Sequence, residues 1–128
     1  MFSLLNRAVH HGEVRESGTK VVITTSADQW SYAVGFPKSP NVVGSKHLVL
    51  VDVLVETGRV SFGALAKDGN TFLFEREVGA DEGPVTVEIP ARDVAGCEVL
   101  MIRNVQGDGQ ASRVLVEAIR VYEGPTGV

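Results

Sequence analysis

The amino-acid sequence predicts an all-β protein, an antiparallel β-sandwich of the jelly-roll type with about eight strands. Apolar and polar residues alternate with a period of two along most of the chain, as in strands with one buried face. The apolar segments are short and rich in β-branched residues. Clusters of Gly, Pro, Asp and Asn separate them at regular intervals, which is typical of strands joined by turns.

Residues 1–18 precede this pattern and are expected to form a short helical or disordered segment. Phe2, Leu5 and Val9 recur at helical spacing, but so short a helix is marginal on its own. Strands are then expected at residues 19–26, 28–36, 47–55, 60–66, 71–78, 85–89, 98–105 and 112–122. Thr57-Gly58 and Asp68-Gly69 supply the positive φ of tight hairpin turns. One domain is therefore expected at residues 19–123, with a tail at 124–128.

The composition limits the partners and the compartment. The chain of 128 residues has a net charge of −4, so no basic surface invites nucleic acid or an anionic membrane. No apolar run approaches the length of a membrane span, and no secretion signal is recognised. Cys97 is the only cysteine, which excludes an internal disulfide and favours a buried, inert thiol. A cytoplasmic protein is expected.

Strand parity assigns the side chains of residues 47–55 to two faces. Val49, Val51, Val53 and Val55 share one side, whereas Asp52 shares the other side with leucines. The valine side is the better core, because a lone buried carboxylate is very costly. Asp52 is therefore expected on the outer face of its sheet.

Charged residues also interrupt the later strands. In residues 112–122 a polar side chain breaks the apolar row on either side, Arg120 on one and Glu117 on the other. Arg103 and Asn104 lie on opposite sides of the preceding strand. Charged groups that converge on a concave outer surface would make a polar site in an apolar trough.

Four segments occur in a characteristic order along residues 19–123: "ADQWSYAVGFP", "SKHLVLVDVLVETGRVSFGAL", "GPVTVEIPARDVAGCEVLMIRN" and "ASRVLVEAIRVYEG". Their order resembles the galactose-binding-like jelly rolls, the fold of many carbohydrate-binding modules and accessory domains of sugar-active enzymes. The resemblance implies that a ligand meets one rim or the concave face, through an aromatic platform and hydrogen-bonding side chains. Many members also carry a structural calcium ion. The acids of this chain are scattered through turns, so no metal and no other cofactor is expected.

The candidate ligand-binding residues are Trp30, Tyr32, Asp52, Arg103, Asn104 and Arg120. Trp30 and Tyr32 are assigned to one strand face, where both rings could stack on a sugar; the alternative is that both are core residues. Asp52 and Arg103 could form a bidentate pair that binds ligand hydroxyl groups, or a purely structural pair. The same alternatives apply to Arg120 and Asn104, and Asn104 could simply end its strand.

No catalytic motif was found: the chain lacks G-x-S-x-G, H-E-x-x-H, a Walker loop and a Rossmann fingerprint, so an enzyme is not expected. The predicted function is a non-catalytic binding module for a carbohydrate or a similar polar small molecule, for instance as an accessory domain of a sugar-active enzyme. The alternative is a structural or oligomerisation domain without a small-molecule ligand. In that case the face with Leu48, Leu50 and Leu54 is buried against a second copy or a parent enzyme.

Overall fold

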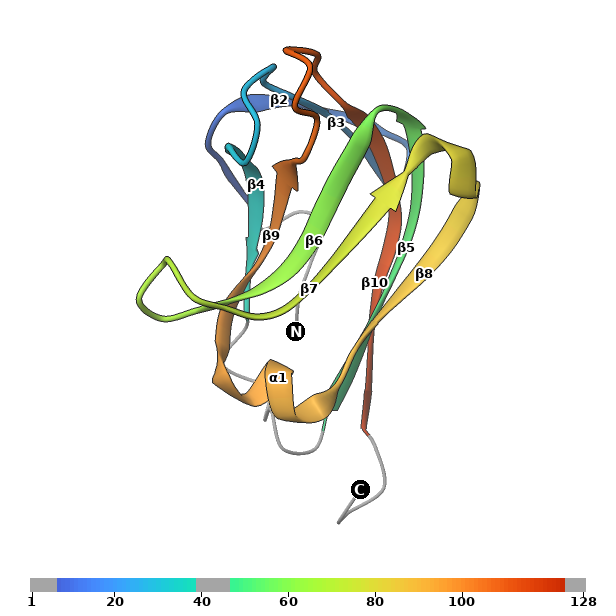
Figure 1. Ribbon diagram of the computed structural model, residues 1–128. Coiled ribbons are helices and arrows are strands. Elements are labelled where there is room, and N and C mark those ends of the chain that lie inside the picture. Colours follow the sequence, from blue (N-terminus) through green and yellow to red (C-terminus); the bar gives the residue numbers. More distant parts are fainter. Residues whose placement is uncertain (1–6, 39–46, 124–128) are drawn as a thin grey trace.

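The computed structural model describes residues 7–38 and 47–123, which form two antiparallel five-stranded sheets packed face to face (Figure 1). Sheet A has the strand order β1-β4-β9-β6-β7, and sheet B has the order β2-β3-β10-β5-β8. The elements are β1 (Ala8–Val9), β2 (Gly12–Ser17), β3 (Lys20–Thr25), β4 (Tyr32–Pro37), β5 (His47–Thr57), β6 (Arg59–Ala66), β7 (Phe72–Gly79), η2 (Ala80–Glu82), β8 (Pro84–Ile89), α1 (Ala91–Gly96), β9 (Cys97–Asn104) and β10 (Arg113–Glu123).

The chain crosses from one sheet to the other at most of its connections. Among the described strands, only the β2-β3 and β6-β7 hairpins join neighbours within one sheet. This winding confirms the predicted all-β jelly-roll sandwich. The connection between β8 and β9 contains the short helix α1, which closes one end of the sandwich (Figure 1). No helix in the described part of the chain is long and apolar enough to cross a membrane. The cytoplasmic location stays a prediction.

The N-terminal segment corrects the expected domain boundary. Residues 1–6 lie outside the described residues, but Ala8–Val9 and Gly12–Ser17 are strands rather than helical or disordered chain. β2 pairs with β3 over its whole length, and Val14 packs against the core. Pairing of the backbone with β3 and β4 therefore outweighs the helical spacing of a few apolar residues. The sandwich includes residues 8–18, which the sequence analysis had set apart from the domain.

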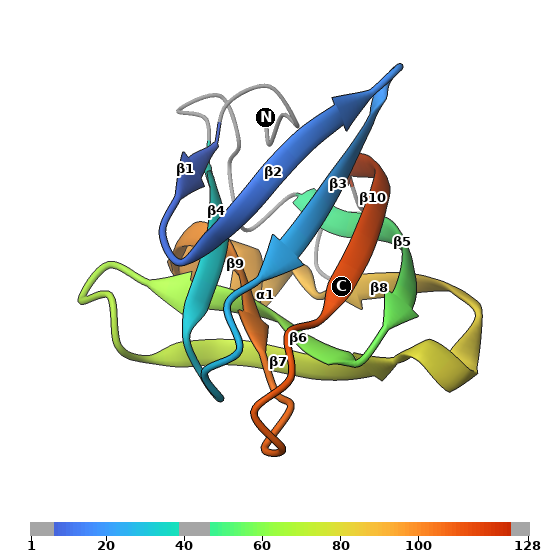
Figure 2. The ribbon, with the colours of Figure 1, turned by 90° about the horizontal axis from the view of Figure 1, so that it is seen from above.

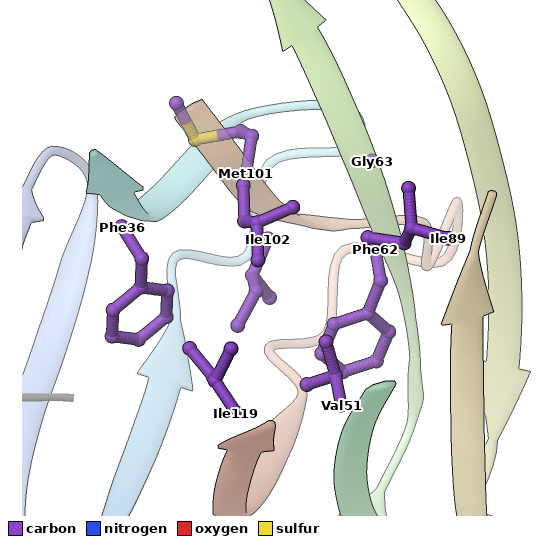
Figure 3. A pocket seen from close by; sticks show the side chains of 9 residues that line it. Phe36, Val51, Phe62, Gly63, Ile89, Met101, Ile102 and Ile119 are labelled. Carbon is purple, nitrogen blue, oxygen red and sulfur yellow. The ribbon is translucent and has the colours of Figure 1, made fainter. Parts of the chain in front are cut away.

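The core lies between the sheets and contains the predicted valine row. Val49, Val51, Val53 and Val55 are all buried there, which confirms that this side of β5 faces inward. Figure 3 shows Phe62 and Ile102 of sheet A pointing toward side chains of sheet B. The cavity between them measures about 10 Å³, which is space for about one water molecule. This cavity is too small for a sugar or another small-molecule ligand.

A bulge in β10 decides which of its residues face outward. Two residues of β10, Glu117 and Ala118, lie where β5 presents Asp52 alone. The extra residue exchanges the two faces of the strand, as β-bulges do. Ile119 consequently packs against the core, while Arg120 faces outward beside Asp52. Strict alternation over residues 112–122 is therefore wrong, and Asp52 lies on the outer face as expected.

Candidate functional site

The outer face of sheet A brings together three of the predicted residues. Tyr32 of β4 is in register with Arg103 of β9, which is in register with Ser61 of β6. Trp30 lies in the loop before β4, and its ring contacts Arg103. Trp30, Tyr32 and Arg103 therefore form one surface cluster, together with Phe72 and Glu75 of β7. We call these five residues the sheet A platform.

The guanidinium group of Arg103 is the centre of this platform. Its Nε and Nη2 atoms lie 2.8 and 2.6 Å from Oε2 of Glu75. Its Cζ atom lies 4.8 Å from the ring centroid of Trp30 and 4.4 Å from that of Phe72. The Ser61 hydroxyl group donates to the same Glu75 oxygen at 2.5 Å. A carboxylate and two aromatic rings thus hold one cation at a defined place on the surface.

Part of this ion pair is free to bind something else. All the contacts above use Nε and Nη2 of Arg103 and Oε2 of Glu75. Nη1 of Arg103 and Oε1 of Glu75 have no hydrogen-bond partner within residues 7–38 and 47–123. The side chains of Arg103 and Glu75 are 18% and 30% exposed. The platform therefore offers solvent one strong donor and one strong acceptor beside aromatic rings.

Tyr32 connects the platform to the β6-β7 hairpin. Its hydroxyl group donates to the backbone oxygen of Gly69 at 3.2 Å, and its ring packs edge-on against Phe72 with centroids 6.0 Å apart. Asp68 stabilises this turn by accepting hydrogen bonds from the Thr71 hydroxyl group and from two backbone amides, which lower the pKa of its carboxyl group. The hairpin turn thus restrains the ring of Tyr32.

Phe72 and Glu75 belong to the platform but were not predicted. A Cβ atom at Gly63 would lie 2.3 Å from Cδ1 of Phe72, so the absence of a side chain there lets the Phe72 ring lie directly on the sheet. A glycine in mid-strand is the sequence signal for such a close approach. Glu75 gives no such signal, because the alternation of side chains within β7 does not reveal which arginine lies across the sheet.

Trp30 is a surface residue rather than a core residue. The residue is 45% exposed. β4 begins only at Tyr32, whereas the expected strand begins at residue 28. Trp30 has a φ of 68°, a left-handed conformation that is uncommon for a non-glycine residue. Beside the platform lies an open depression of about 340 Å³, lined by His10, His11, Trp30, Ser31 and Tyr32.

Asp52 and Arg120 lie on the other outer face, that of sheet B. Nε and Nη2 of Arg120 donate to the two carboxylate oxygens of Asp52, each at 2.8 Å, and Thr86 donates to Oδ1 at 2.7 Å. These hydrogen bonds, that of Arg120 above all, lower the pKa of Asp52. The predicted pair of Asp52 with Arg103 does not form, because β5 and β9 belong to different sheets. The predicted site is therefore divided between two faces.

Asn104 lies on neither face. Its side chain is 0% exposed, and Nδ2 donates to the backbone oxygens of Ser26, Asp28 and Gln110. Oδ1 accepts hydrogen bonds from the Ser112 hydroxyl group and the Gln106 amide. A fully buried side chain with these partners has no surface for a ligand, so the interpretation of Asn104 as a ligand contact is corrected.

Neither metal-ligating clusters nor an activated thiol occur in the described part of the chain. Within it, no three His, Cys, Asp or Glu side chains converge as a metal site would require. Cys97 is buried, and this burial raises the pKa of its thiol to about 11. The expectation that Cys97 is buried is therefore confirmed, and its low reactivity stays a prediction.

Comparisons with known proteins show the fold. No protein-family model matches the chain, and no curated protein matches it. A solved family 29 carbohydrate-binding module aligns with a TM-score of 0.66 at 14% identity, over 94% of this chain and 79% of that chain. A variant of such a module, complexed with cellulohexaose, aligns with a TM-score of 0.65 at 13% identity, over 94% and 81% of the two chains. In PfGH50B the match covers 94% of this chain but 22% of that chain, with a TM-score of 0.64 at 12% identity. The chain thus has the β-sandwich fold of carbohydrate-binding modules, as its resemblance to that group implied.

Proposed function

We propose that this protein is a non-catalytic carbohydrate-binding module and that the sheet A platform binds the glycan. One observation carries the proposal: Arg103 is fixed by Glu75 against Trp30 and Phe72, and both members of the ion pair keep an unused polar atom facing solvent. The combination of a fixed charge pair and exposed rings is the chemistry that a sugar requires.

A sugar ring has an apolar C–H face and a rim of hydroxyl groups. The exposed indole of Trp30 suits the first, because aromatic rings bury much apolar area at little conformational cost. Arg103 and Glu75 suit the second, because a hydroxyl group both donates and accepts hydrogen bonds. Their mutual ion pair orients both side chains before a ligand arrives, which reduces the entropy lost on binding.

The solved structures of the same fold support the ligand class. Two variants of one family 29 module were solved in complex, one with mannohexaose and one with cellulohexaose. The match to about a fifth of PfGH50B supports a module attached to a larger chain, which we propose as the setting in which this domain acts. A glycan is accordingly the proposed ligand, and a sugar-active enzyme is the proposed partner.

Calorimetric titration with cellulohexaose and mannohexaose, preceded by a glycan array, tests this proposal. We expect wild-type protein to bind at least one glycan, and Trp30→Ala to weaken binding by about tenfold or more, because exposed aromatic anchors dominate such surfaces. Arg103→Ala should weaken binding similarly. Since Trp30 is the only tryptophan, its fluorescence should also change when the ligand binds.

Arg120→Ala provides the matched control. It removes an arginine that is likewise paired with a carboxylate and close to an aromatic ring, but on sheet B. We expect its glycan affinity to equal that of wild-type protein. Loss of binding in Arg120→Ala with retention in Arg103→Ala would move the site to sheet B, and absence of any glycan binding by folded wild-type protein would refute the proposed function.

The alternative, an assembly domain, concerns the same sheet B face. Leu48, Leu50 and Leu54 are half-buried there, and the ion pair of Asp52 with Arg120 lies between them. A face with a charge pair at its centre is a poorer docking surface than a continuous apolar patch. Light scattering decides this point: a stable dimer that binds no glycan would favour the alternative.

A further inference from the structure

We propose that Asn104 is a positioning residue that holds the ring of Trp30 on the sheet A platform without touching the ligand. Its effect on glycan affinity rests on the proposed function, whereas its effect on Trp30 does not. The end of β9 carries Arg103 and Asn104 as neighbours, and their side chains leave the strand on opposite faces. Arg103 contacts the ring of Trp30 from outside the sandwich, and Asn104 holds the Trp30 loop from inside.

The backbone of Trp30 is bound directly to Asn104. The Trp30 amide donates to the backbone oxygen of Asn104 at 2.6 Å, and the Asn104 amide donates to the oxygen of Ser31 at 3.2 Å. The side chain of Asn104 adds hydrogen bonds to the oxygens of Ser26 and Asp28 in the same loop. The loop that carries Trp30 is thus attached to one residue at several points.

The same asparagine also binds the loop that leads from β9 to β10. Nδ2 donates to the oxygen of Gln110, and Oδ1 accepts from Gln106 and Ser112. Figures 1 and 2 show that the β3-β4 and β9-β10 loops lie side by side at one end of the sandwich. Asn104 therefore joins two loops that are far apart in sequence, from a position where water cannot replace it.

The chemistry of the site requires an amide side chain. Backbone oxygens from both loops surround Nδ2, so a carboxylate in its place would repel them, and an apolar side chain would leave buried polar groups unpaired. The left-handed backbone of Trp30 is an unfavourable conformation that persists only where its surroundings enforce it. Asn104 supplies that enforcement and so determines where the exposed indole lies.

Hydrogen exchange in wild-type protein tests the attachment of the Trp30 loop to Asn104 without any substitution. Although Trp30 lies in a surface loop, we expect its amide to be strongly protected, because it donates to the oxygen of Asn104. Exchange of this amide at the rate of an unprotected peptide would overturn the inference. This measurement is independent of whether the protein binds glycans.

Asn104→Ala tests the side chain itself. In the folded variant we expect the fluorescence anisotropy of Trp30 to fall and its quenching by acrylamide to rise. Val87→Ala is the matched control, because it creates a cavity at a fully buried position of β8 in sheet B and should leave the Trp30 signal unchanged. Equal Trp30 signals in folded Asn104→Ala and wild-type protein would overturn the inference.

A double-mutant cycle tests whether Asn104 affects glycan binding through Trp30. Asn104→Ala should weaken glycan affinity by roughly tenfold. In this variant the Trp30 loop would become ordered only when the ligand binds, and the entropy lost in that step reduces the affinity. In a Trp30→Ala background the same substitution should cost nothing further, because the residue through which it acts is gone. A tenfold loss that persists without Trp30 would overturn the positioning role. If wild-type protein binds no glycan, the proposed function fails, and exchange and fluorescence alone decide the role of Asn104.

Discussion

Asp52 and Arg120 form a bidentate ion pair on the outer face of sheet B, although strict alternation would place Arg120 with the core residues of β10. The bulge at Glu117 brings them together, because it adds one residue to β10 opposite Asp52. Val114 and Val116 before the bulge and Ile119 and Val121 after it consequently all pack inward. The bulge thus accommodates one extra residue without turning Arg120 into the core.

Deletion of Glu117 should therefore be tolerated. Without the extra residue, Val116 and Ala118 would follow each other in regular alternation, so Ile119 would still pack inward and Arg120 would still face outward. The deletion removes only the local irregularity of the bulge. We expect the deletion variant to keep a cooperative thermal transition by circular dichroism.

Glu117→Ala is the control for this deletion, because it keeps the chain length and the bulge. It removes only a 3.8 Å ion pair with Lys20 between two exposed side chains, so stability should change by less than about 0.5 kcal/mol. A deletion variant without a cooperative transition would contradict the interpretation of Glu117 as the extra residue of the bulge.

The pair of Asp52 and Arg120 should make stability depend on pH. The pKa of Asp52 is lowered in the folded protein, mainly by the hydrogen bonds from Arg120. Its stabilising contribution is therefore fully present above the ordinary value of 3.8 and is lost as the pH falls through the lower folded-state pKa. At pH 7 we expect Asp52→Asn to lower the free energy of unfolding by about 1 kcal/mol.

Urea denaturation of both proteins between pH 7 and pH 2 measures this effect. The difference between wild-type protein and Asp52→Asn should narrow at the acidic end, because protonated Asp52 no longer attracts Arg120. A difference that stays constant over this range would show that the ion pair contributes no charge-dependent stability.

Gly63 should tolerate a side chain only when Phe72 is removed. A Cβ atom at Gly63 would meet two atoms of the Phe72 ring at 2.3 and 2.4 Å, so the ring must move away from Arg103. We expect Gly63→Ala to destabilise the protein by about 1–3 kcal/mol, as overpacking does. Thermal denaturation measures this change.

The double variant Gly63→Ala/Phe72→Ala separates this clash from other effects. Because the ring is gone, the alanine at position 63 should be far less destabilising in the Phe72→Ala background than in wild-type protein. Equal destabilisation in both backgrounds would mean that the Phe72 ring does not lie on Gly63.

The fold could be predicted where local pattern and tertiary packing agree. The valine row of β5 has one face that suits a core and one that carries Asp52, so its orientation follows from burial alone. The bulge at Glu117 could not be predicted in this way, because it is a relation between β10 and β5 rather than a property of either strand. Residues 8–17 were missed because a few apolar residues at helical spacing do not reveal that a neighbouring strand is available.

The site was predicted in part, for a similar reason. Trp30, Tyr32 and Arg103 stand out by residue type, and the sheet brings them together. Phe72 and Glu75 do not stand out, because their importance depends on the order of β9, β6 and β7 in sheet A. Residue chemistry therefore indicates candidate ligand contacts, whereas strand order decides which candidates share a face.

Cys97 should react slowly with thiol reagents in the native protein. Its side chain is buried, and desolvation raises the pKa of the thiol to about 11. At pH 8 only about one thiol in a thousand is then ionised, compared with roughly a quarter for an exposed cysteine. We expect reaction with a disulfide reagent to be at least a hundredfold slower in native protein than in urea, where Cys97 is exposed. A native rate close to the denatured rate would mean that the end of the sandwich near α1 opens readily.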